Sequence, residues 1–254
     1  MNEKKSRSRS TSEVVAANRR RILTNEMPFA IKEAYVKLRT NLMFCMTADK
    51  TRPCRSFAIT SAKPSEGKSL TASNIAISYA MLGKKVILID ADMRKPTQRR
   101  LWKIGTGVGL CDYLAKMSDL NPVKVRDLPL WVLCTGTIPP NPSELLSSDR
   151  MKNFVEECTD IYDYVIIDTP PINTVADAQI VSTYVDGIVL VAKSGETTTD
   201  ELNAAIDAVH RAGGNLCGVV LNDLNMKSVK YSYKYKYGDK YGYRYSYSNP
   251  YETK

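Results

Sequence analysis

One loop of the chain has the residue types that bind phosphate groups. Its sequence is Ala62-Lys63-Pro64-Ser65-Glu66-Gly67-Lys68-Ser69, and it lies between an apolar run, Phe57 to Thr60, and a helical pattern, Ser69 to Leu82. A strand, such a loop and a helix form a phosphate-binding unit, in which backbone N–H groups and the helix dipole attract an anion. We predict that Lys68 bridges the β- and γ-phosphates of ATP and that Ser69 ligates Mg²⁺. The loop residues predicted to contact the cofactor are Lys63, Pro64, Ser65, Glu66, Gly67, Lys68, Ser69 and Leu70.

Three carboxylates follow two other apolar runs. Asp90 and Asp92 come at the end of Val86 to Asp90, and Asp168 ends Val165 to Asp168. Acidic groups next to buried strands are costly unless something uses their charge. We predict that Lys68 and the three Asp residues are catalytic, with one Asp of the 90/92 pair acting as a general base. Asp92 and Asp168 would join Ser69 around the metal ion. A capping or surface role remains an alternative for either member of the pair alone.

The elements that position these residues alternate between strand and helix. Apolar, β-branched strands separated by helices predict an α/β fold with a mostly parallel sheet covered by helices on both faces. In such sheets ligands bind at the carboxyl ends of the strands, where the site residues fall. Asn222, after the last strand, would contact the nucleotide base or simply turn the chain. The predicted strands are 57–60, 86–90, 131–134, 165–168, 187–192 and 217–221, and the predicted helices are 28–47, 69–82 and 199–212.

Charge and composition narrow the class of protein. The net charge is +9, of which residues 1–21 and 227–254 each carry +5, leaving −1 on the part between them. A nucleic-acid-binding face on the folded part would need positive charge there, so no nucleic-acid partner is expected. The basic ends suit an anionic membrane surface or an acidic partner. No apolar run approaches the roughly 20 residues needed to span a bilayer. The six scattered cysteines indicate reduced thiols in a cytosolic protein.

The last part of the chain is rich in tyrosine. We predict a disordered basic lead over residues 1–25, a folded domain over 26–226 and a disordered tail over 227–254. An exposed row of phenols beside a nucleotide site suggests an acceptor for the phosphoryl group. The predicted phosphoacceptors are Tyr231, Tyr233, Tyr235, Tyr237, Tyr241, Tyr243, Tyr245, Tyr247 and Tyr251.

Several motifs together resemble the bacterial tyrosine kinases (BY-kinases) of capsule and exopolysaccharide synthesis, in their separate cytoplasmic form typical of Gram-positive bacteria. The most family-specific motif is Pro139-Pro140-Asn141-Pro142-Ser143-Glu144-Leu145-Leu146, which general partition-type ATPases lack. The other matching segments are 63–69, 90–98, 162–171 and the tyrosine tail.

The resemblance implies a P-loop NTPase (partition-ATPase-like) fold and an ATP- and Mg²⁺-dependent kinase that phosphorylates the tyrosine cluster of a neighbouring subunit in a ring. It implies a membrane-anchored activator of the polysaccharide co-polymerase type, whose cytoplasmic tail recruits the kinase from the cytoplasm to the inner face of the plasma membrane. Phosphorylation would make the charge of the tail more negative, and a tyrosine phosphatase would be required to return the tail to its unmodified state. On the family's oligomer-contact helix, Glu33 and Arg39 are present, but Val36 replaces the usual middle arginine.

Two other functions are considered. Lys63 stands five residues before Lys68, where partition-type ATPases have a lysine that reaches across a dimer, although a solvated loop lysine is an alternative. An ATPase that positions cargo by ATP-dependent dimerisation would leave the tail tyrosines unexplained. A non-enzymatic scaffold would leave the intact Lys68, Ser69 and three carboxylates unexplained.

Overall fold

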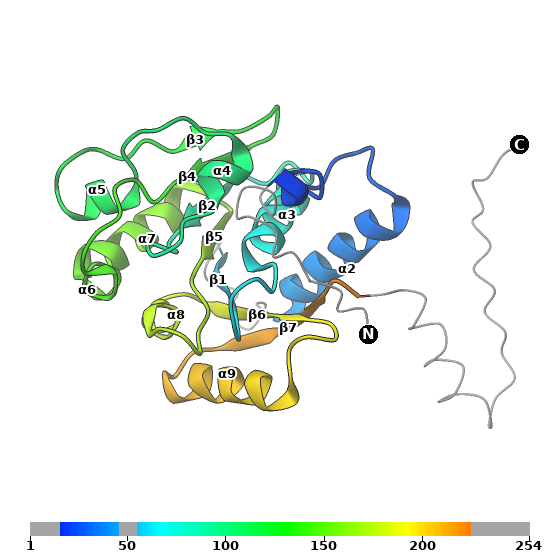
Figure 1. Cartoon of the computed structure of the whole chain (residues 1–254). Coiled ribbons are helices and arrows are strands. Elements are labelled where there is room, and N and C mark those ends of the chain that lie inside the picture. The colour runs from blue at the N-terminus through cyan, green and yellow to red at the C-terminus, as the bar shows by residue number, and fades with distance from the viewer. Residues whose placement is uncertain (1–15, 46–54, 225–254) are drawn as a thin grey trace, which may run out of the picture. The chain divides into compact units, whose positions relative to one another are not determined.

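The structure, a computed structural model, describes residues 16–45 and 55–224 of the chain. A seven-stranded sheet has the order β3-β4-β2-β5-β1-β6-β7 (Figure 1). Neighbouring strands pair in parallel except β3, which runs antiparallel to β4. The strands are β1 (Arg55–Ser61), β2 (Val86–Asp90), β3 (Val123–Lys124), β4 (Leu130–Leu133), β5 (Tyr164–Asp168), β6 (Gly187–Lys193) and β7 (Leu216–Asn222). The predicted mostly parallel α/β sheet is confirmed.

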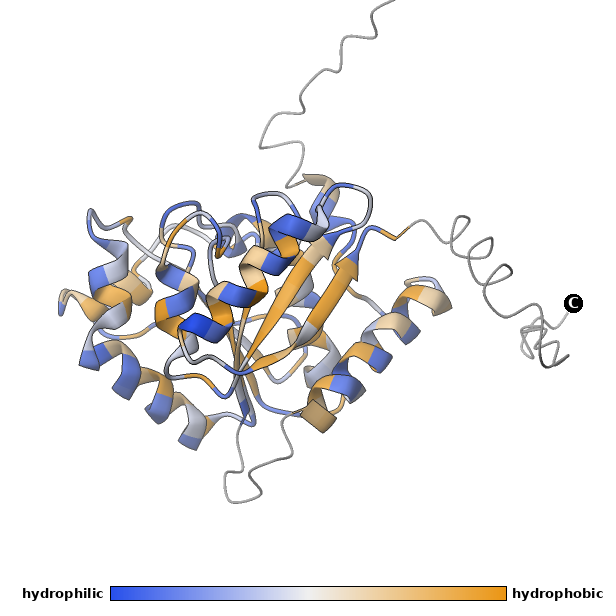
Figure 2. Cartoon of the chain, turned by 90° about the horizontal axis from the view of Figure 1, so that it is seen from below, coloured by the Kyte–Doolittle hydropathy of each residue, from blue (hydrophilic) through white to orange (hydrophobic). Residues whose placement is uncertain are grey.

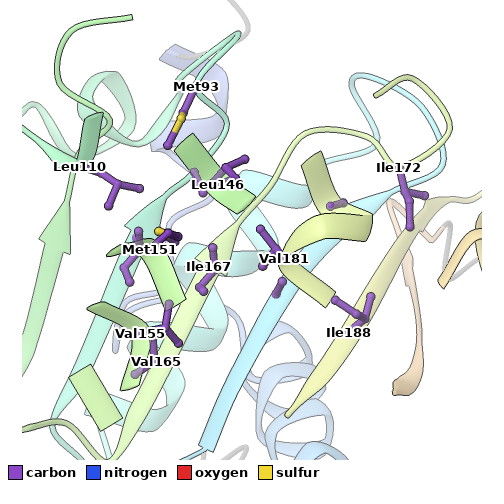
Figure 3. Close-up of a cluster of buried hydrophobic side chains, with 14 of the residues drawn as sticks. Met93, Leu110, Leu146, Met151, Val155, Val165, Ile167, Ile172, Val181 and Ile188 are labelled. Atoms are coloured by element: carbon purple, nitrogen blue, oxygen red, sulfur yellow. The ribbon is translucent and has the colours of Figure 1, made fainter. Parts of the chain in front are cut away.

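Alternate strand residues supply two separate cores, one on each face of the sheet. In β2, Ile87 and Ile89 belong to one core, and Val86 and Leu88 belong to the other. The first core packs under α5 (Leu110–Leu114), α6 (Pro142–Ser147), α7 (Asp149–Ile161), α8 (Asp177–Ser182) and α9 (Thr199–Arg211), and Figure 3 shows part of it. The second packs under α2 (Phe29–Cys45), α3 (Lys68–Ala80) and α4 (Gln98–Trp102). Figure 2 shows apolar strands flanked by helices that carry both polar and apolar residues, as expected when each helix buries one side.

The sequence pattern predicts the long helices next to the first and last strands but not the helices between β2 and β6. Each end of the three predicted helices is found within two residues of its predicted position, which is the usual uncertainty of a helix end. The prediction lacks the two-residue strand β3 and the helices between β2 and β6, most of which have only five or six residues.

The amino-terminal segment differs from its prediction. Residues 16–25 were expected to be disordered, but Ile22 and Leu23 are buried in the second core. The backbone N–H of Leu23 donates to Asn74 Oδ1 at 2.8 Å, and Asn74 Nδ2 donates to the Arg21 carbonyl at 3.0 Å. The apolar pair within a basic stretch explains why this segment packs on the domain. Residues 1–15 and the predicted tail, 227–254, lie outside the described residues.

Candidate active site

The phosphate-binding loop joins the end of β1 to the start of α3. Ser65 (φ 69°) and Gly67 (φ 91°) both adopt left-handed backbone conformations, and the Gly67 carbonyl accepts the N–H of Thr71 at 2.9 Å. Left-handed residues within such a turn orient N–H groups toward a concave side that suits an anion. The local backbone therefore has the form that the sequence predicts for a phosphate cradle.

Lys68 lies where three side-chain oxygens converge. Its Nζ is 2.7 Å from Asp92 Oδ2, 3.3 Å from Asp168 Oδ1 and 3.3 Å from Ser69 Oγ. All four residues are buried. Burial lowers the pKa of the Lys68 ammonium, but the charges of Asp168 and Asp92 outweigh it, so the pKa of Lys68 is raised. In this structure Lys68 is the counter-charge of these carboxylates, and its contact with the phosphates of ATP stays a prediction.

Asp90 has one occupied and one unpaired oxygen. Its Oδ2 accepts the N–H groups of Thr97 at 3.0 Å and Gln98 at 2.9 Å. Its Oδ1 is buried and has no hydrogen-bond partner, a condition shared by only two other side-chain atoms among the described residues. Burial, followed by the charge of Asp168, raises the pKa of Asp90 to about 8. A carboxylate oxygen held in this way can accept a proton or a hydrogen bond from a ligand.

The oxygens around Lys68 fit a hard cation. Ser69, Asp92 and Asp168 offer hydroxyl and carboxylate oxygens, which Mg²⁺ prefers, and they already surround one positive charge. Among the described residues, no group of three or more His, Cys, Asp or Glu side chains is placed to hold a metal ion. Mg²⁺ is often bound by only a few protein oxygens, and phosphates and water complete its coordination shell.

Gln98 connects two of the predicted catalytic and metal-binding residues, although the sequence pattern did not predict a role for it. Its Nε2 donates to Asp168 Oδ2 at 2.8 Å and to the Ser69 carbonyl at 3.0 Å. Its Oε1 accepts from Ser73 Oγ at 2.8 Å and Trp102 Nε1 at 3.1 Å. The side chain is fully buried, so it fixes the orientation of Asp168 relative to α3. The only sequence signal was its place at the end of the 90–98 motif.

Glu66 stabilises the phosphate-binding loop through its carboxylate and its backbone carbonyl. Its Oε2 accepts the N–H of Lys63 at 3.0 Å, and its Oε1 accepts the hydroxyl of Thr197. Asn222, which was predicted to contact the cofactor, donates from Nδ2 to the Glu66 carbonyl at 2.9 Å. Glu66 is 1% exposed. In this structure, Glu66 and Asn222 therefore support the loop backbone, and direct cofactor contact remains a prediction for both.

The side chain of Lys63 is paired with two residues near the start of α9. Its Nζ lies 2.8 Å from Glu201 Oε2 and donates to the Glu196 carbonyl at 2.8 Å. The hydrogen bond from Lys63, together with the N–H of Thr198, lowers the pKa of Glu201 to about 2. Glu201 also belongs to the capping box of α9. The sequence pattern did not indicate this pair, because its members are far apart in the chain.

The family-specific proline segment reaches the site through an ion pair. Arg94, two residues after Asp92, contacts Asp177 through Nε at 2.8 Å and NH2 at 3.1 Å. Ser143 Oγ donates to Asp177 Oδ1 at 2.7 Å and accepts from Arg94 NH2 at 3.0 Å. Asp177 is fully buried. Ser143 therefore links the proline segment to the loop that carries Asp92.

The predicted oligomer-contact residues lie on α2. Arg39 NH1 donates to the Ser78 carbonyl at 2.6 Å and to Ser78 Oγ at 3.2 Å, so its guanidinium holds α2 against α3 within the same chain. Glu33 is partly exposed. A contact with another subunit stays a prediction for both residues. The nine predicted phosphoacceptor tyrosines lie outside the described residues.

Comparisons with known proteins decide the family. A family model described as "ParA: NUBPL iron-transfer P-loop NTPase" matches residues 54–245, which agrees with the fold. The tyrosine-protein kinase YwqD of Bacillus subtilis is 44% identical over 204 residues, covering 79% of this chain and 85% of that protein. This chain belongs to the bacterial tyrosine kinase family. The putative tyrosine-protein kinase CapB of Staphylococcus aureus is 37% identical, covering 80% of this kinase chain and 89% of that protein.

A solved structure supports the same assignment. The kinase domain of the Escherichia coli tyrosine kinase Etk superposes with a TM-score of 0.74 at 34% identity, covering 89% of this chain and 87% of that one. The resemblance drawn from the phosphate-binding loop, the carboxylates and the proline segment is confirmed.

Proposed function

We propose that this kinase uses ATP and Mg²⁺ to phosphorylate the carboxyl-terminal tyrosines of a neighbouring copy of itself. The observation that carries the proposal is the buried cluster of Lys68, Asp92 and Asp168 beside the unpaired Oδ1 of Asp90. The cluster lies at a phosphate-binding loop in a chain that also carries nine tyrosines between residues 231 and 251. A nucleotide site would account for the buried cluster, and a role as phosphoryl acceptor would account for the nine tyrosines.

The residues divide the chemistry between them. The tyrosine oxygen attacks the γ-phosphorus, the bond to the leaving ADP oxygen breaks, and Asp90 takes the phenolic proton on Oδ1. Lys68 exchanges its carboxylate partners for phosphate oxygens and stabilises their charge. Ser69, Asp92 and Asp168 would hold Mg²⁺, which neutralises phosphate charge when bound. Gln98 keeps Asp168 oriented throughout.

The setting of the reaction is also proposed. We expect a ring of copies, a membrane-anchored activator of the polysaccharide co-polymerase type that brings the kinase from the cytoplasm to the inner face of the plasma membrane, and a role in capsular or exopolysaccharide synthesis. A tyrosine phosphatase would remove the phosphate groups from the tail. No nucleic-acid partner is expected. In the ranges 16–45 and 55–224, no helix is long and apolar enough to cross a bilayer.

A mixing experiment tests the proposal. An active chain truncated at Lys227 is incubated with an acceptor chain that carries Lys68→Met and an intact tail, together with Mg²⁺, labelled ATP and the activator's cytoplasmic tail. We expect phosphotyrosine on the acceptor. An Asp90→Asn acceptor serves as a second inactive chain, since its fold is expected to be less disturbed. No label on either acceptor, while a separate sample of the intact active chain becomes labelled, would show transfer within one chain.

The same assay separates the alternative function. A partition-type ATPase, which would position cargo by ATP-dependent dimerisation, would release free phosphate and leave no phosphotyrosine on either chain. Lys63 favours this alternative by its position, but its ammonium is paired with Glu201 of the same chain. We therefore retain the kinase as the proposed function.

A further inference from the structure

A cavity of about 730 Å³ opens away from the catalytic cluster, near the β3 edge of the sheet. Its walls come from the amino-terminal segment, from α4 and the loop after it, and from residues 121–126 around β3. These segments lie side by side in Figure 1, and Arg19 joins two of them by donating from Nε to the Arg100 carbonyl at 2.8 Å. None of the phosphate-binding loop, Asp90, Asp92 or Asp168 lines it. Its size is that of a small-molecule or side-chain site.

The cavity lining is strongly basic. It contains five cationic side chains and no Asp or Glu. In the part of the chain that the structure describes, none of the five forms an ion pair with a carboxylate. Cations gathered without a counter-charge repel one another, so an anion would be stabilised among them. The five residues are Arg19, Arg99, Lys103, Lys124 and Arg126.

The arginines are fixed in place by the backbone of the domain. Arg99 donates from NH1 to the Gly105 carbonyl at 3.1 Å and from NH2 to the Gly107 carbonyl at 2.7 Å. Arg126 donates from NH1 to the Leu23 carbonyl at 2.9 Å, and its guanidinium lies 5.5 Å from the centroid of the Trp102 ring. Burial lowers the pKa of Arg126, a cost that a bound anion would offset. The cavity is therefore held in shape by contacts that leave guanidinium N–H groups available.

We propose that this cavity binds phosphotyrosine from the phosphorylated tail of this protein. Arginine and lysine side chains grip a phosphate dianion, and the Trp102 ring offers an aromatic wall for the phenyl group. The tail's charge makes the binding selective: unmodified, residues 227–254 carry +5 and are repelled by the cavity. Each phosphate adds about −1.5 to −2, so the modified tail is attracted. The source of the phosphotyrosine rests on the proposed function, whereas the binding site does not.

Binding of a synthetic peptide tests the site without using the kinase activity. The peptide spans residues 240–251, carries phosphotyrosine at 241, 243, 245 and 247, and bears a fluorescent label. The receptor is the full-length protein, treated with an immobilised tyrosine phosphatase and kept free of ATP. Anisotropy is measured at moderate salt for the phosphorylated peptide, the unmodified peptide and a peptide with Glu at the four positions.

Matched charge reversals locate the site. Lys103→Glu with Lys124→Glu removes cavity charge, whereas Lys116→Glu with Lys84→Glu makes the same change of net charge outside the cavity. Lys116 (φ 61°) matches Lys103 (φ 57°) in its left-handed backbone and exposure. We expect only the phosphorylated peptide to bind well, and the cavity variant to weaken it by about tenfold or more.

Three results would overturn the proposal. If the glutamate peptide binds as tightly as the phosphorylated peptide, the cavity binds acidic segments in general and is not specific for phosphotyrosine. Equal loss in both lysine variants would indicate net charge alone. No loss in the cavity variant would place the phosphopeptide elsewhere. Because the phosphopeptide is synthetic, failure of the proposed kinase reaction would leave this result unchanged.

Discussion

The ammonium of Lys68 has two competing sets of partners, the proposed nucleotide phosphates and the buried carboxylates. A phosphate-binding lysine is usually considered for what it does to the nucleotide, yet here its ammonium also compensates Asp92 and Asp168 in a buried site. Removing one partner of a buried charge group leaves the others uncompensated, which costs more than the pair itself contributed. The residue therefore has a structural role in addition to its proposed catalytic one.

We expect Lys68→Met to lose tail phosphorylation and also to lower the free energy of unfolding by about 3–5 kcal/mol at neutral pH. Urea unfolding measures the second effect. Lys152→Met is the control, since Lys152 and Asp149 form an exposed pair at 3.4 Å that should contribute less than about 1 kcal/mol. Equal stability of wild type and Lys68→Met would show that the carboxylates need no counter-charge.

The proposed role of Asp90 as a base can be tested by comparison with a second buried carboxylate that also accepts two backbone N–H groups. Asp90→Asn should lower the rate of phosphoryl transfer by about 10²–10⁴, because the amide cannot accept the proton. Asp112→Asn is the matched control: Asp112 is also buried and accepts two backbone N–H groups, from Gly109 at 2.8 Å and Thr137 at 3.1 Å. Single-turnover rates compare the two. Similar losses in both variants would assign Asp90 a structural role only.

The Lys63–Glu201 pair predicts a pH effect on stability. The folded pKa of Glu201, about 2, lies below its ordinary value of 4.5, so the pair stabilises the fold above pH 4.5 and this contribution is lost as pH falls toward 2. In Lys63→Met, we expect the pKa of Glu201 to rise toward 4.5, as measured by NMR titration of its carboxyl group. Any stability difference between the two proteins should then vanish at acid pH. An unchanged pKa in the variant would assign the shift to Thr198 alone.

At the scale of elements, the sequence predicted what is local or periodic. The six parallel strands follow from apolar β-branched runs, and the strand-end positions of Asp90 and Asp168 follow from the same runs. Gln98, Thr197 and Glu201 were missed because their roles depend on contacts between segments distant in the chain. The folded segment at residues 16–25 was missed because two apolar residues within a basic stretch give little periodic signal.

The phosphate-binding loop and β7 should be coupled through Gly67. A Cβ added at Gly67 would lie 2.1 Å from Asn222 Nδ2, so Gly67→Ala should displace Asn222 and break its bond to Glu66. We expect weaker ATP binding by calorimetry. Gly83→Ala is the control, because Gly83 (φ +77°) has a similar backbone but nothing within 4 Å of an added Cβ. In an Asn222→Ala background, Gly67→Ala should cost less, as expected for residues in contact. Additive losses would argue against this coupling.

At the scale of the whole molecule, charge is distributed unevenly along the chain. The two ends are basic, the part between them is close to neutral, and the basic cavity beside β3 has no acidic lining. A tail that begins at +5 and becomes negative on phosphorylation would exchange one set of partners for another. Phosphorylation would thereby act on assembly as well as on binding.

We expect the unmodified kinase to assemble and the heavily phosphorylated kinase to come apart. Three or four phosphates, at about −1.5 to −2 each, reverse the sign of the tail, so that crowded tails in a ring repel one another and leave anionic surfaces. Val36, at the usual arginine position of α2, should make the ring weaker and more sensitive to this repulsion. Light scattering on both forms measures their mass at low and moderate salt. Because salt screens charge over about 10 Å at 0.1 M, the difference should shrink as salt rises. Equal mass in both forms under all conditions would show that tail charge does not control assembly.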